Sequence, residues 1–186
     1  PGADNKEQLQ VIRDVLAVTK PNEPMYDMVG SCIFRPDGYF ICCHPYGEFR
    51  DTLSRPVPTL RESLISRQTK FLVMDRVGFV FWQTPTPDLS FLLSNYLPTK
   101  YNKMYSLGQE FRCQNSACVP PGANRSTNFF TILVHEKYTV TIEPNTASAT
   151  VDGKEIRNGQ TLDLAAGPHR FLVSSPVTSF RIQLTR

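Results

Sequence analysis

Five cysteines are the residues of this chain with the clearest capacity for specific chemistry. Cys113 and Cys118 are separated by the short polar segment Gln-Asn-Ser-Ala, which a disulfide could close in an oxidising compartment. Cys42 and Cys43 are adjacent and precede His44, so these side chains could bind zinc together with the first pair. Neither half has the C-x-x-C spacing of strong zinc signatures. A disulfide is the leading prediction, and free thiols and a zinc site are the alternatives.

The predicted strand that carries Cys42 and Cys43 limits what these two residues can do. Consecutive side chains of a strand point to opposite faces, so at most one of them could share a site with Cys113 and Cys118. The Cys-Cys-His sequence would also permit a nucleophilic thiol, but cysteines on an apolar run such as 39–43 more often pack in a core. We accordingly expect neither a metal nor a cofactor.

No motif of a known catalytic site is present. The sequence lacks G-x-S-x-G, a P-loop, a G-x-G-x-x-G after a strand and H-E-x-x-H. Asp27 and Asp75 lie near the ends of predicted strands, where α/β proteins place ligand groups, although surface or capping carboxylates are the simpler alternative. Trp82 precedes a proline-rich segment and could stack on a sugar or pack over a sheet. We predict no catalytic residue and name Trp82, Asp27 and Asp75 as candidate ligand contacts.

Composition excludes several classes of protein. The chain has 186 residues, of which 40% are hydrophobic and 20% charged, enough for one average domain or two small ones. Its net charge of +3, without clustered basic residues, argues against a nucleic-acid surface. No apolar run approaches the ~20 residues of a membrane span. Because the chain opens Pro-Gly-Ala without Met or a signal-peptide pattern, we expect a piece of a longer protein or a processed form.

The first part of the chain alternates helix and strand patterns. Capping boxes that begin at Asp4 and Thr59 predict two helices, the first with Leu9, Ile12 and Leu16 at helical spacing. A third helix is expected over 89–96. Apolar runs predict three strands at 25–29, 71–74 and 103–107. Strands that alternate with helices imply right-handed crossovers, so we predict an α/β fold with a small parallel sheet and flanking helices.

The last sixty residues have a different pattern. Alternating apolar positions recur between turns, and Asp152-Gly153 is a strong hairpin signal, which together predict an all-β, sandwich-like subdomain. Twelve of the 15 prolines lie before residue 122, and segment 118–127 has the composition of a linker. We therefore divide the chain into an α/β domain, 1–125, and a β subdomain, 126–186.

Several segments of the first part also match a known order of elements. They are Gln-Leu-Gln-Val-Ile-Arg-Asp-Val-Leu at 8–16, Pro-Asn-Glu-Pro-Met-Tyr-Asp at 21–27, Ile-Phe-Arg-Pro-Asp at 33–37, Lys-Phe-Leu-Val-Met-Asp at 70–75 and Met-Tyr-Ser-Leu-Gly at 104–108. Over about residues 6–108 this order resembles the soluble C-terminal domain of bacterial GT-C-type membrane glycosyltransferases, similar to the dolichyl-phosphate-mannose–protein mannosyltransferase superfamily.

The resemblance implies a non-catalytic accessory domain on the extracytoplasmic (periplasmic) face of the cell membrane. Its partners would be an upstream transmembrane region of the same chain and a glycan or a polyprenyl-phosphate sugar, but no nucleic acid. The family's catalytic acidic residues would lie upstream, so none is carried onto this chain. A stand-alone carbohydrate or cell-wall binding module is the main alternative, and a small thiol- or metal-dependent enzyme is a third.

Overall fold

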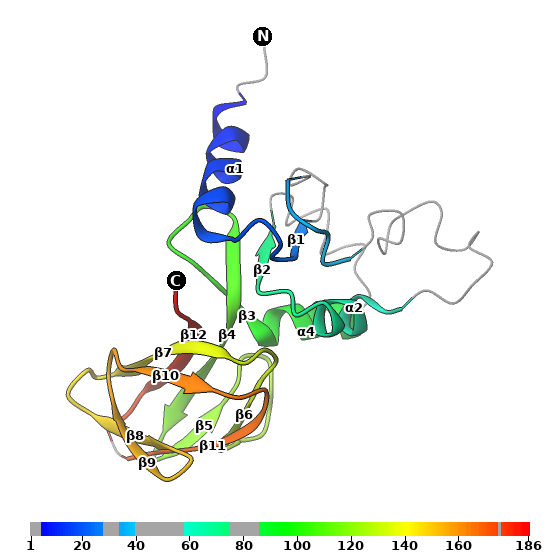
Figure 1. Cartoon of the computed structure of the whole chain (residues 1–186). Helices are drawn as coiled ribbons and strands as arrows, with labels where there is room; N and C mark the ends of the chain where they lie inside the picture. The colour runs from blue at the N-terminus through cyan, green and yellow to red at the C-terminus, as the bar shows by residue number, and fades with distance from the viewer. Residues whose placement is uncertain (1–4, 28–33, 40–57, 75–85, 175) are drawn as a thin grey trace. The chain divides into compact units, whose positions relative to one another are not determined.

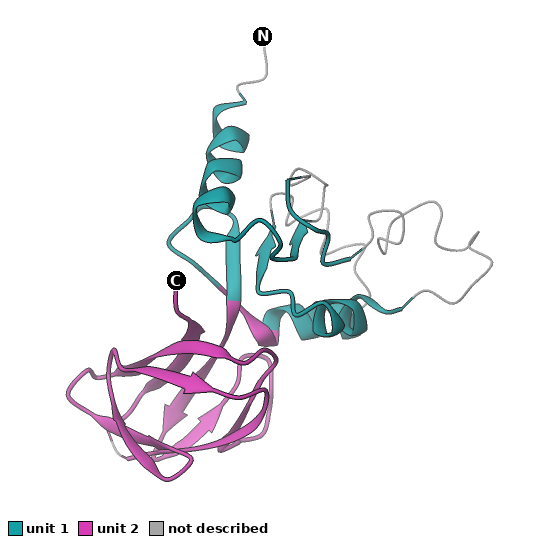
Figure 2. Cartoon of the chain, in the orientation of Figure 1, with its two compact units in different colours: residues 1–93, 98–106 teal, residues 94–97, 107–186 magenta. Residues whose placement is uncertain are grey.

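The computed structural model describes residues 5–27, 34–39, 58–74, 86–174 and 176–186 (Figure 1). The chain forms two compact units (Figure 2). Unit 1 comprises Pro1–Leu93 and Pro98–Ser106, and unit 2 comprises Ser94–Leu97 and Leu107–Arg186. One boundary between the units falls within strand β4 (Met104–Gln114), after Ser106. The predicted boundary at residue 125, between an α/β domain and a β subdomain, stays a prediction.

Three helices lie among the described residues: α1 (Lys6–Val18), α2 (Leu60–Ser66) and α4 (Thr86–Asn95). A capping box begins α2, as the sequence predicts. The Thr59 hydroxyl accepts from the Glu62 N–H at 3.2 Å, and the Glu62 carboxylate accepts from the Thr59 N–H at 2.8 Å. Asp4, the predicted cap of α1, lies outside the described residues, and Asn5 at the N-cap makes no side-chain cap.

The buried side of α1 differs from its most regular apolar stripe. Val11 and Val15 are the buried residues of the helix, whereas Leu9 and Leu16 are 50% and 42% exposed. The valines are therefore the residues that α1 buries, and the leucines are exposed to solvent.

The sheet of unit 1 corrects the expected parallel arrangement. Strand β1 (Met25–Asp27) pairs in parallel with β2 (Phe71–Val73), but β2 pairs antiparallel with the first residues of β4. The reversal comes from β3 (Tyr96–Pro98) and the tight turn that follows it, where the Thr99 N–H donates to the Met104 carbonyl at 2.9 Å. The run at 103–107 is thus the start of a long antiparallel strand that returns along β3, not a crossover strand.

Unit 2 contains strands of two sheets. The first runs in the order β4, β12 (Ser179–Leu184), β7 (Glu136–Glu143) and β10 (Thr161–Leu164), with β5 (Ala117–Val119) on β4. The second runs β6 (Phe129–Ile132), β11 (Gly167–Val173), β8 (Ser148–Val151) and β9 (Lys154–Arg157). Within the described residues, 42% are in strands and 21% in helices, so the fold is predominantly β and the predicted α/β class is wrong.

Four phenylalanines fill the space between the two sheets of unit 2. Phe111 and Phe180 come from the first sheet, and Phe130 and Phe171 from the second; all four are at most 2% exposed. The rings of Phe171 and Phe180 stack with centroids 4.5 Å apart, and those of Phe111 and Phe171 are 4.8 Å apart. Such pairs stabilise a core beyond the area that they bury, so this phenylalanine cluster holds the sheets together.

The substitution Phe180→Ala should destabilise unit 2 by about 3–5 kcal/mol, because it removes a stacked ring and leaves a cavity. Urea unfolding followed by circular dichroism measures this loss. Phe129→Ala is the matched control, since Phe129 is 53% exposed and should change the free energy of unfolding by no more than about 0.5 kcal/mol. Equal losses for the two variants would contradict the assigned core.

Candidate functional site

Of the three candidate ligand contacts, Asp27 is the one that lies among the described residues. Asp27 ends β1 opposite Val73 of β2 and is half-buried. Asp75, Trp82 and the cysteines Cys32, Cys42 and Cys43 lie outside the described residues. A ligand site that combines Trp82, Asp27 and Asp75 stays a prediction. Among the described residues, no group of three or more His, Cys, Asp or Glu side chains could hold a metal ion.

Cys113 and Cys118 are joined by a disulfide in the β4–β5 hairpin. They face each other across the two strands, and Asn115 and Ser116 form the turn with φ angles of 50° and 65°. Asn adopts this left-handed conformation more readily than most residues. Both cysteines are buried. Their sulfur atoms are bonded to each other, so neither serves here as a zinc ligand.

The outer face of the second sheet carries a groove of about 300 Å³. It lies over β8, β9 and β11, and its lining residues are Ser148, Ala149, Thr150, Glu155, Leu172, Val173 and Ser174. The strand register brings these residues together, because Thr150 faces both Leu172 and Glu155 across neighbouring strands. The volume is at the lower end of the range for small-molecule sites. No pattern in the sequence indicated this groove.

The groove combines an apolar surface with groups that bind hydroxyls. Leu172 is 48% exposed, and on the same face Phe129 pairs with Arg170. Glu155 can accept hydrogen bonds, and the hydroxyls of Ser148 and Thr150 can donate or accept them. The groove therefore offers an apolar contact beside hydrogen-bonding groups.

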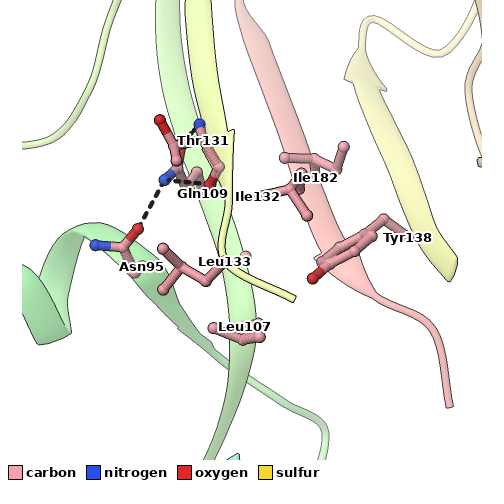
Figure 3. Close-up of a pocket in the computed structure, with 9 residues that line it drawn as sticks. Asn95, Leu107, Gln109, Thr131, Ile132, Leu133, Tyr138 and Ile182 are labelled. Atoms are coloured by element: carbon pink, nitrogen blue, oxygen red, sulfur yellow. Dashed lines mark hydrogen bonds between the residues drawn. The ribbon is translucent and has the colours of Figure 1, made fainter. Parts of the chain in front are cut away.

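A much smaller cavity of unit 2 has a structural role (Figure 3). Its volume of about 10 Å³ leaves room for one water at most. Beside it, the Gln109 side-chain amide donates to the Asn95 side chain at 2.9 Å and to the Thr131 carbonyl at 3.2 Å. The Thr131 N–H donates to the Gln109 amide oxygen at 3.4 Å. Gln109 thus satisfies backbone groups of strand β6 as a neighbouring strand would.

His169 and Asp152 form the most compact ionisable pair of unit 2. The His169 Nδ1 lies 2.6 Å from the Asp152 carboxylate, and its Nε2 lies 2.9 Å from the Ala165 carbonyl. Both partners are oxygen atoms that can accept a hydrogen bond. The other Asp152 oxygen accepts from the Arg170 N–H at 2.9 Å. The pair therefore fastens the Asp152-Gly153 turn to β11, and no nucleophile adjoins it among these contacts.

The pKa of Asp152 reflects two opposing effects. Desolvation raises it, but hydrogen bonds from the His169 ring and the Arg170 N–H outweigh that effect and lower the pKa below its ordinary value. The folded state thus holds this proton less tightly than the unfolded state does. The resulting stabilisation is present above the ordinary carboxyl pKa and is lost as pH falls through the lower, folded value.

Within the described ranges, no helix has the length and apolar character needed to cross a bilayer. No protein-family model, curated protein or solved structure matches the chain.

The substitution Asp152→Asn tests the pH dependence of this pair. The stability difference between the wild type and the variant should shrink as pH is lowered from about 4 to about 2, because the wild-type carboxylate then takes up its proton. Thermal unfolding across this range measures the difference. The control is Asp163→Asn, whose partner His135 lies 2.7 Å away in a pair that is about two-thirds exposed. Solvent screening should leave that variant with a smaller effect; identical pH profiles for both variants would refute the assignment.

Proposed function

We propose that this chain is a non-catalytic extracytoplasmic accessory domain of a membrane-embedded glycosyltransferase that uses a polyprenyl-phosphate sugar donor. In this proposal the sugar transfer takes place elsewhere in the protein. The chain supports the membrane core or helps to recognise the acceptor or the donor. The resemblance over about residues 6–108 suggests the class of enzyme.

The Cys113–Cys118 disulfide is the observation that supports an extracytoplasmic location. Disulfides persist in oxidising compartments and are rare where thioredoxin and glutathione keep thiols reduced. The bond closes a six-residue hairpin and is buried, so it is part of the folded unit 2. An extracytoplasmic location explains why such a bond is kept.

The groove over β8, β9 and β11 supports a role in recognition. It offers an apolar surface at Leu172 beside the Glu155 carboxylate and the Thr150 hydroxyl, which suits a sugar ring. A shallow site of this kind suits reversible binding of an acceptor glycan or of the sugar of a lipid-linked donor.

Surface labelling of intact source cells tests the location. Lys137 and Lys154 are exposed on unit 2 and should react with a membrane-impermeant amine reagent without permeabilisation. Mass spectrometry of the tryptic digest reports the label at each site. A K137R/K154R variant should lose the label at these positions, and a cytoplasmic protein of the same cells should stay unlabelled. Labelling of both lysines only after permeabilisation would overturn the proposed location.

The second candidate function is a stand-alone carbohydrate or cell-wall binding module, and the groove is the observation that favours it. The two functions differ in whether the protein is attached to the membrane. The first predicts that the labelled protein stays with the membrane fraction after high-salt washing. Recovery of the mature protein outside the membrane fraction, with glycan binding that Glu155→Gln weakens, would favour the second.

A further inference from the structure

Helix α1 presents an apolar stripe to solvent on the side away from its packing contact. Leu9 and Leu16 are 50% and 42% exposed, while Val11 and Val15 are buried. Ile12, which is half-buried, lies between the leucines along the helix. Exposed leucines two turns apart form a continuous apolar line, which a lone surface leucine does not.

The charges of α1 are separated around the helix axis. At about 100° per residue, Leu16 lies about 20° from Leu9, and Arg13 about 40° from it on the other side. Lys6 follows at about 60°, and both basic residues are exposed. The carboxylates of Glu7 and Asp14 lie about 140–160° from Leu9. The exposed side is therefore apolar along one edge and basic along the other.

The acidic residues of the helix are engaged away from this side. The Glu7 carboxylate lies 3.0 Å from the Lys103 ammonium and accepts from the Asn102 amide at 2.9 Å. The hydrogen bond from Lys103, together with that from Asn102, lowers the pKa of Glu7. Asp14 accepts from the Gln10 amide at 2.9 Å. Both carboxylates thus have hydrogen-bond partners of their own.

We propose that the Leu9–Ile12–Leu16 face of α1 lies on the surface of a bilayer that contains anionic phospholipid. The leucines would enter the boundary between headgroups and acyl chains, and Arg13 would contact lipid phosphates. An apolar stripe beside basic residues is the pattern of helices that lie in a membrane interface. A second copy of the chain bound through the same face is the alternative occupant, which a dimer in solution would reveal.

This inference adds a lipid contact to the proposed membrane-side location, but it rests on the geometry of α1 alone. Its test uses purified chain and vesicles, so its failure would leave the labelling result intact, and the reverse also holds.

Vesicle sedimentation tests the lipid contact. The purified 186-residue chain should bind vesicles of phosphatidylcholine with about one-third phosphatidylglycerol, and bind pure phosphatidylcholine at least about tenfold more weakly. The variant L9Q/L16Q should lose about tenfold or more in affinity. Arg13→Gln should lose about fivefold, the equivalent of ~1 kcal/mol per basic residue near an anionic surface, and less in high salt.

The matched control is Leu93→Gln, which replaces an equally exposed leucine on α4 and should bind like the wild type. All of these positions are exposed, so unfolding midpoints should stay close to the wild-type value. Three results would overturn the proposal: no binding to anionic vesicles, equal losses for L9Q/L16Q and Leu93→Gln, or a dimer in solution that L9Q/L16Q dissociates.

Discussion

The packing of four phenylalanines between its two sheets is the interaction on which unit 2 depends. Because side chains alternate along a strand, burying Phe130 and Phe171 forces Phe129 and Leu172 to the outer face. The groove therefore follows from the core: Thr150 and Leu172 of its lining alternate along their strands with residues that fill the interior. A one-residue slip of β11 would exchange the two sets and remove both the core and the groove.

Local signals in the sequence were enough to predict local structure. Thr59 and Glu62 form the capping box that their spacing indicates, and Asp152-Gly153 forms a turn between paired strands. The fold class was wrong because it depended on strand direction, which is set by distant pairing. The run at 103–107 reads equally well as a parallel or an antiparallel strand, and only the hairpin with β3 decides between them.

The candidate sites also differ in whether they depend on residues close in sequence or on distant pairing. Cys113 and Cys118 could be paired from sequence, because five positions of chain hold them close whatever the rest of the fold does. The groove could not be found, since Thr150, Glu155 and Leu172 become neighbours only through the register of three strands. The sequence also could not show which side of α1 is exposed. Its valines and leucines are all apolar, and only the packing shows which of them are buried.

The proposed location is an oxidising compartment, and the state of Cys113 and Cys118 in protein from its own cells tests this location most directly. Cells are treated with a thiol-alkylating reagent before lysis, and the protein is digested with trypsin without reduction. The account predicts that peptide 113–125 is recovered unalkylated and lighter by two hydrogen atoms than its reduced form. Recovery of this peptide with both cysteines alkylated would contradict the proposed location.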